Sequence, residues 1–176
     1  MPVRIETPVS AEIIRDLKVG DQLEITGTIY TGRDAALPRL VKAIKENALS
    51  SLHVDLQGGI IFHTAVSSAG IGPTTSNKVE IEESMAPLSE AGIKIHIGKG
   101  SISSDTIKSL QEFHSIFAVT PPVSALFSRS IVSIKVVAFP EEGMEAIHEL
   151  TVRKFPAIVA VSQGESIYDQ GTTGGP

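Results

Sequence analysis

The order of apolar and polar positions predicts strands and helices that alternate along most of the chain. Gln22–Tyr30 alternates with β-branched residues, as a half-buried strand does, and Gly27 marks a break or bulge in it. Further strands are predicted at Gly58–Val66, Ile93–Ile97, Ile116–Val119 and Ile131–Phe139. Because helical patterns separate these strands, the sequence predicts an α/β fold with a mainly parallel central sheet.

Capping residues and apolar spacing indicate the helices. Ser10 is predicted to cap a helix over Ala11–Leu17, and Asp34 a helix that reaches about Asn47. Other helices are predicted at Val79–Ala91, Ser104–Phe113 and Pro122–Arg129. The segment Ser67–Asn77, rich in Gly, Ser and Thr, is predicted to be a loop.

The last third of the chain contains strand patterns without helices between them. Ala146–Val152 alternates and Ala157–Val161 is a short buried run, so we expect an added β layer beside the parallel sheet. There is no internal repeat and no linker pattern. Residues 1–170 are therefore expected to form a single domain, followed by a disordered tail at 171–176.

Composition and charge narrow the functional classes. The formal net charge of −5 argues against nucleic-acid binding, because phosphate contacts need a basic surface. The apolar runs are too short for a membrane span, and the N-terminal residues carry no apolar signal core, so a cytoplasmic protein is expected. The absence of cysteine excludes disulfides and any thiolate-bound zinc or iron–sulfur cluster in this chain. The histidines show no ligand spacing, so no metal site is predicted.

Three loops with polar side chains among glycines follow successive predicted strands. They are 31–34 with Arg33, 70–78 with Thr74, Thr75 and Lys78, and 98–100 with Lys99. Ligands of an open α/β sheet gather beyond the carboxyl ends of its parallel strands. There, the Arg33 fork suits one carboxylate, while the lysines and threonine hydroxyls suit a second. The residues alone predict an anion-binding α/β domain.

Each loop also has a purely structural explanation. Arg33 and Asp34 would form an ion pair at a helix start, with Asp34 only capping that helix. Gly-Pro-Thr-Thr would be an ordinary turn before a helix. Gly98-Lys-Gly100 lacks the spacing of a phosphate-binding P-loop, so nucleotide binding is not expected. Only the occurrence of all three loops after successive strands favours a binding site.

Several segments together resemble the β subunit, or fused C-terminal domain, of class I fumarases and L-tartrate dehydratases. They are Leu17–Asp21, Gly27–Asp34, Gly72–Ser76, Ile97–Gly100 and Phe155–Val159, in the family's order. The resemblance implies a swivelling three-layer β/β/α domain. It also implies a larger α subunit whose cysteines bind a 4Fe–4S cluster, with the two subunits pairing as a possible dimer of heterodimers. The lack of cysteine in this chain fits that division.

The resemblance also implies roles for individual residues. Arg33 would clamp a substrate carboxylate, Thr74 would take part in proton transfer, and Lys99 would contact the substrate. Lys78 stands where the family usually has arginine, so the charge remains but the fork geometry does not.

The implied activity is the reversible hydration of a small dicarboxylate, with fumarate and malate first and tartrate next. This chain would be inactive alone. A second departure from the family is Leu37, which stands where a histidine is usual. Leu37 and Lys78 keep an alternative open, in which the chain is a non-catalytic paralogue that binds a small anion or docks on a partner.

Overall fold

The computed structural model describes residues 1–67, 70–74, 78–121 and 129–168. The predicted helix at 122–129, except its last residue, and the predicted tail at 171–176 lie outside these residues. The helices are α1 Ala11–Asp16, α2 Leu37–Lys45, α3 Lys78–Glu90 and α4 Ser104–Glu112, with short 3-10 turns η1 Leu49–Ser51 and η2 Pro140–Glu145. Within the described residues, no helix combines the length and apolar character needed to cross a membrane.

Eight strands form the main sheet, and two more form a separate hairpin. The main strands are β1 Val3–Glu6, β2 Gln22–Thr31, β3 Ile60–Phe62, β6 Ile95–Gly98, β7 Ile116–Val119, β8 Ile131–Ala138, β9 Ile147–Ser162 and β10 Glu165–Ser166. The hairpin consists of β4 Thr64–Ser67 and β5 Gly70–Thr74. Alternating strands and helices confirm the predicted mixed α/β class.

The main sheet closes on itself. Strands β1, β2, β3, β6 and β7 pair in parallel, in that order. The long strand β9 then pairs antiparallel with both β7 and β2, so β2, β3, β6, β7 and β9 form a barrel-like ring. The expected extra strands thus join the same sheet, which contains more antiparallel pairing than predicted because β9 also pairs with β8 and β10.

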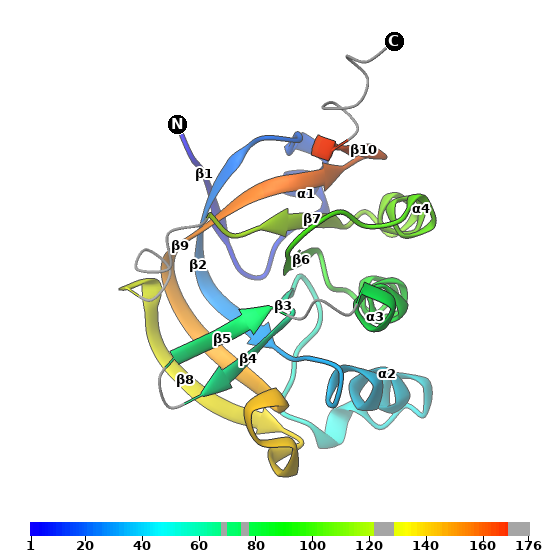
Figure 1. Ribbon diagram of the computed structural model, residues 1–176, viewed down its shortest axis with the longest axis vertical. Coiled ribbons are helices and arrows are strands. Elements are labelled where there is room, and N and C mark those ends of the chain that lie inside the picture. The colour runs from blue at the N-terminus through cyan, green and yellow to red at the C-terminus, as the bar shows by residue number, and fades with distance from the viewer. Residues whose placement is uncertain (68–69, 75–77, 122–128, 169–176) are drawn as a thin grey trace.

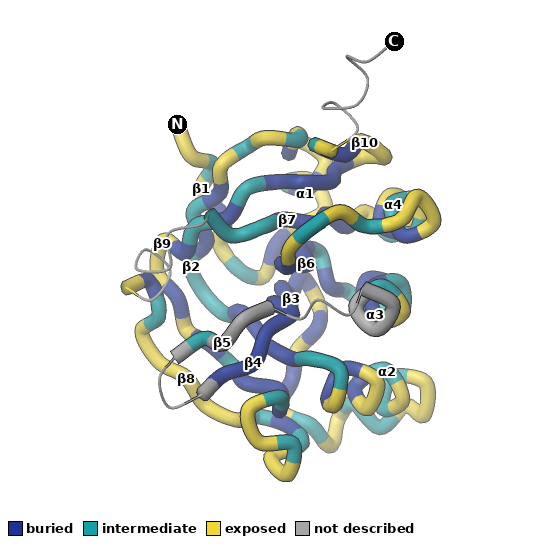
Figure 2. The backbone as a smooth tube through the Cα atoms, in the orientation of Figure 1, coloured by how far each residue is buried: buried dark blue, intermediate teal, exposed yellow. Residues whose placement is uncertain are grey.

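The core has two main parts, inside the ring and beneath the helices. Inside the barrel-like ring of strands, the phenyl groups of Phe62 and Phe155 meet edge to face, with their centroids 5.8 Å apart. Helices α2, α3 and α4 lie along one outer face of the sheet (Figure 1). Leu40 of α2 and Leu88 of α3 pack with Ile61 of β3 there. Strand β3 is therefore buried on both faces, as Figure 2 shows at the centre of the molecule.

An irregularity is found at Gly27 as predicted, but β2 is continuous there and the extra residue of the bulge lies on β9. The pairing of β2 with β9 shifts register between Ile25 and Gly27, where Arg153 and Lys154 of β9 face Thr26. Gly27 has a φ of 128°, and a Cβ there would overlap the hydroxyl of Thr7. That hydroxyl accepts a hydrogen bond from the Thr28 N–H at 2.8 Å, so a side chain at 27 would disrupt it.

Three of the strand and loop predictions differ from the structure. The predicted strand Gly58–Val66 divides at His63 into β3 and β4, because the ladder with β2 ends at the pair Thr31 and Phe62. The chain beyond it pairs with Gly70–Thr74, which was predicted as loop. Its Gly and Pro residues disfavour a strand locally, but pairing with β4 overrides that preference. The two predicted runs in the last third form one strand, β9.

Of the two predicted helix caps, Ser10 and Asp34, the first is confirmed and the second was wrong. Ser10 caps α1, its hydroxyl accepting from the Ile13 N–H at 3.3 Å. Asp34 does not cap α2, which begins three residues later after Ala36 and has no side-chain cap. A turn closed by hydrogen bonds to the Arg33 carbonyl occupies the intervening residues.

Candidate functional site

The carboxyl ends of β2, β3 and β6 lie side by side. In the parallel ladders Thr31 is opposite Phe62, and Phe62 is opposite Ile97. Two hydrogen bonds continue the alignment past the strands: the Gly32 N–H donates to the Phe62 carbonyl at 3.1 Å, and the His63 N–H to the Ile97 carbonyl at 2.9 Å. The strand ends therefore place the backbones of Arg33 and Lys99 on either side of His63, at the edge where α/β proteins bind ligands.

Backbone contacts hold the Arg33 loop. The Arg33 carbonyl accepts from the N–H groups of Ala36 at 3.1 Å and Leu37 at 2.9 Å. The Glu145 carboxylate accepts from the Ala35 N–H at 3.0 Å, which ties this turn to η2. A Cβ on Gly32 would come within 2.8 Å of the Leu37 side chain, so glycine allows the turn to fold back tightly.

The side chain of Arg33 is half-buried, and its Nε is fully buried. Within the described residues Arg33 forms no ion pair, and in particular none with Asp34. The structural alternative of an ion pair and cap at the helix start is thus not found. A buried guanidinium N–H needs an acceptor, and an anion would provide one.

Among the described residues, three buried side-chain atoms lack a hydrogen-bond partner: Thr31 Oγ1, Arg33 Nε and His63 Nδ1. All three belong to the adjoining carboxyl ends of β2 and β3. An unpaired buried polar atom costs about 1–3 kcal/mol, so such atoms are few in folded proteins. Their concentration at one edge indicates a site built to meet polar atoms of another molecule.

The other predicted site residues are placed less completely. Thr74 is the last residue of β5, and its backbone lies opposite Thr64, which directly follows His63. Lys78 is the first residue of α3. The side chains of both, and all of Thr75, lie outside the described part of the structure. Lys99 directly follows β6, and its side chain is exposed.

Leu37, the residue at the family's usual histidine position, is part of the core. It is the first residue of α2 and is only 3% exposed. It packs with Leu40, Ile61 and Ile147 under the helices. Leu37 therefore contributes apolar packing beneath the Arg33 loop and no polar group.

Sequence reasoning missed a buried pair of histidines beside this edge. His63 and His96 are fully buried, and His63 Nε2 lies 3.3 Å from His96 Nδ1. Burial lowers the pKa of His63 to about 3; burial, and then the charge of a protonated His63, lower the pKa of His96 well below its usual range. Both rings are consequently neutral near neutral pH.

The residues of this chain do not fit an iron–sulfur cluster. Cysteine thiolates hold such clusters, and the chain has none. Within the described ranges, no three His, Asp or Glu side chains gather in an arrangement for a metal ion. The unpaired atoms at the strand ends come from an alcohol, a guanidinium and an imidazole, a set that suits oxygen atoms of an organic anion.

A separate hollow of about 380 Å³ lies between α2 and α3. It is lined by Pro38, Val41, Lys42, Lys45, Glu83, Ser84 and Pro87. None of the predicted site residues lines it, and none of the three unpaired buried atoms does. The edge formed by the carboxyl ends of β2, β3 and β6, called the strand-end edge below, is therefore the better candidate for a site.

Comparison with known proteins identifies the family to which this chain is related. The model of the family described as Fumarase C-terminus matches residues 1–171. A protein of Methanocaldococcus jannaschii named "Putative L(+)-tartrate dehydratase subunit beta" is 34% identical over 172 residues, covering 89% of this chain and 86% of that protein. The "L(+)-tartrate dehydratase subunit beta" of Escherichia coli K12 is 30% identical over 169 residues, covering 89% of this chain and 81% of that protein.

A protein of Geobacillus stearothermophilus named "Putative fumarate hydratase class I" is 31% identical over 182 residues. The match covers 95% of this chain but 34% of that relative, so a single longer chain there contains the matching region. Tartrate dehydratases and fumarate hydratases are both hydro-lyases. On the family match and the shared length of these relatives, the chain belongs to the fumarase C-terminus family.

Proposed function

We propose that this chain is the β subunit of a two-subunit hydro-lyase that adds water to, or removes it from, a small dicarboxylate. The observation that carries the proposal is the group of unpaired buried polar atoms at the ends of β2 and β3, in a chain related to tartrate dehydratase β subunits. A dicarboxylate has the oxygen atoms that such donors require.

The proposed roles follow from the chemistry of each side chain. Arg33 holds one carboxylate through its guanidinium, and Lys78 and Lys99 stabilise the second carboxylate and the negative charge that develops as a carbon–hydrogen bond breaks. Thr74 orients or relays the proton. A threonine hydroxyl alone is a weak base at neutral pH, so Thr74 needs a neighbouring group to assist it. Thr75 contributes a further hydroxyl to the carboxylate.

The rest of the catalytic centre is assigned to a partner. Because this chain lacks cysteine, a 4Fe–4S cluster would be held by a cysteine-bearing α subunit. We infer a cytoplasmic assembly that forms a dimer of heterodimers. Within it, residues 1–170 act as one swivelling β/β/α domain that brings the strand-end edge to the partner.

Fumarate and malate are the substrates we favour, with tartrate next. These diacids share both carboxylates and differ in their hydroxyl groups, so Arg33 and the lysines serve either substrate. The observation that favours the non-catalytic alternative is the burial of Leu37, which leaves no polar group at that position. In that alternative, a domain that only binds a small anion or docks on a partner would retain Arg33 but would not catalyse a reaction.

Reconstitution with the partner tests the proposal. The purified chain alone is expected to give no hydration of fumarate and no dehydration of malate or tartrate. After it is mixed with its cysteine-bearing partner and treated anaerobically with iron and sulfide, turnover should appear for at least one of them. Product formation followed by absorbance, with the partner alone as the control, provides the measurement.

The outcomes separate the possibilities. Turnover by the isolated chain would disprove the two-subunit arrangement. A stable complex with a loaded cluster but no turnover of any small dicarboxylate would favour the non-catalytic alternative. Relative kcat/KM values for malate and tartrate would identify the preferred diacid.

A further inference from the structure

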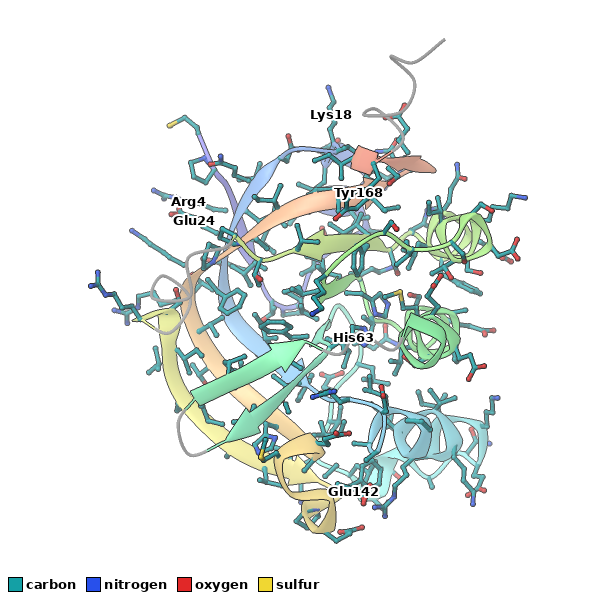
Figure 3. The ribbon with its side chains drawn as sticks, in the orientation of Figure 1. Arg4, Lys18, Glu24, His63, Glu142 and Tyr168 are labelled. Atoms are coloured by element: carbon teal, nitrogen blue, oxygen red, sulfur yellow. The ribbon has the colours of Figure 1, made fainter. Side chains whose placement is uncertain are left out.

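Three buried polar side chains form a continuous row between the sheet and α3. The hydroxyl of Ser89, on α3, lies 2.8 Å from Nε2 of His96 on β6. Nδ1 of His96 lies 3.3 Å from Nε2 of His63, and the two ring planes are inclined by 27° with centroids 5.5 Å apart, so the rings meet edge to edge. Figure 3 shows His63 next to α3 at the end of β3. The row ends at His63 Nδ1, which is buried and has no partner among the described residues.

The hydrogen-bond inventory favours one direction of the row. Both imidazoles are neutral, so each ring has one donor and one acceptor nitrogen. If the Ser89 hydroxyl donates to His96 Nε2, His96 carries its proton on Nδ1 and donates to His63 Nε2. The proton of His63 is then on Nδ1. In the reverse direction the Ser89 hydroxyl proton has no acceptor within the described residues, so the first arrangement is favoured.

The position of His63 relates this free N–H to the candidate site. Its backbone N–H bonds the carbonyl of Ile97, two residues before Lys99. The carbonyl of Phe62, just before it, accepts from Gly32, just before Arg33. The next residue, Thr64, lies opposite Thr74 in the hairpin. His63 is therefore central among the residues that are proposed to hold the dicarboxylate.

We propose that His63 is a further ligand-binding residue of this site, whose Nδ1–H, set by the row Ser89–His96–His63, donates a hydrogen bond to an oxygen of the bound dicarboxylate. This inference rests on the proposed function for the identity of the ligand. Ser89 and His96 are positioning residues, because they act through His63. A neutral donor adds a hydrogen bond at the centre of the site without adding a further positive charge beside Arg33 and Lys99.

The tautomer can be measured without turnover. In the full chain labelled with ¹⁵N-histidine, long-range ¹H–¹⁵N spectra near neutral pH should show His63 neutral and protonated on Nδ1. Ser89→Ala removes the donor to His96 Nε2, so the His63 proton should move toward Nε2. A His63 that is charged, or protonated on Nε2 in the wild-type chain, would overturn the proposal.

Kinetics of the assembled enzyme test the contact with the ligand. His63→Leu should raise KM about tenfold, as expected for one lost hydrogen bond to a charged group. His63→Asn, which places an amide N–H near the position of Nδ1, should recover most of that loss. Ser89→Ala should also raise KM, as His63→Leu does. The matched control is His53→Leu, an exposed position where KM should not change.

The results distinguish this inference from the proposed function. Unchanged KM in His63→Leu, with an active wild-type complex, would overturn the role of His63 alone. Equal KM values for His63→Leu and His63→Asn would also overturn it, because a purely structural role does not require the N–H. A wild-type complex inactive on every dicarboxylate would overturn the proposed function and the ligand that is inferred for His63.

Discussion

Arg33→Ala is expected to lower kcat/KM of the assembled enzyme by on the order of 10²- to 10³-fold. The Arg33 Nε is buried and has no partner among the described residues, so it is available for a substrate carboxylate. Charge-assisted hydrogen bonds to a carboxylate are among the stronger polar contacts in proteins, and alanine removes them completely. Steady-state kinetics of the reconstituted complex measure the effect.

Two variants control this prediction. Arg33→Lys keeps the charge but loses the planar fork, so it should recover only part of the activity. Arg4→Ala removes an arginine that is exposed on β1 and lies away from the strand ends in Figure 3, so it should leave kcat/KM unchanged. If Arg33→Ala has the same kcat/KM as the wild type, Arg33 does not contact the substrate and the non-catalytic alternative gains support.

Phe62→Ala is expected to lower the free energy of unfolding by about 3–5 kcal/mol. Phe62 is 1% exposed and packs edge to face on Phe155 inside the ring. Alanine would remove this contact and leave a cavity where β3 meets β9. Since small domains are stable by only about 5–15 kcal/mol, the variant should be close to unfolding at ordinary temperatures. Urea denaturation followed by circular dichroism measures the change.

Phe62→Leu and Val132→Ala provide the comparison. Leucine fills much of the same volume, so its effect should be well below that of alanine. Val132 is 63% exposed on β8, and its truncation should change stability by about 0.5 kcal/mol or less. A loss of less than about 1 kcal/mol in Phe62→Ala would contradict the closed, well-packed ring.

Features that depend on neighbouring residues could be predicted from the sequence. The cap at Ser10 follows from local chemistry and is confirmed; the irregularity at Gly27 was also predicted, although its extra residue lies on the paired strand β9. Features set by distant pairing could not. The strand Gly70–Thr74 exists because β4 needs a partner, and the late start of α2 depends on the fold of the Arg33 turn.

The candidate site shows the same division. The sequence order of strands and loops was enough to expect Arg33 and Lys99 at one edge, where the parallel register places their backbones. The roles of Thr74, Thr75 and Lys78 stay predictions, because their side chains lie outside the described residues.

The histidine row could not be found from spacing along the chain. His63 and His96 meet because β3 pairs directly with β6, with Ile61 opposite His96 and His63 two positions further on the same face. The available signal was weak: a histidine follows one buried strand, and another lies within the next buried strand of the sheet. Without the strand order, no rule connects them.

A structure of the assembled enzyme with a bound dicarboxylate would show whether the ends of β2, β3 and β6 hold the ligand. We expect a ligand carboxylate within about 2.7–3.2 Å of a guanidinium nitrogen of Arg33, at the edge formed by the ends of β2, β3 and β6. A ligand held entirely by the partner, or one seated in the hollow between α2 and α3, would contradict the claim that these strand ends form half of the active site.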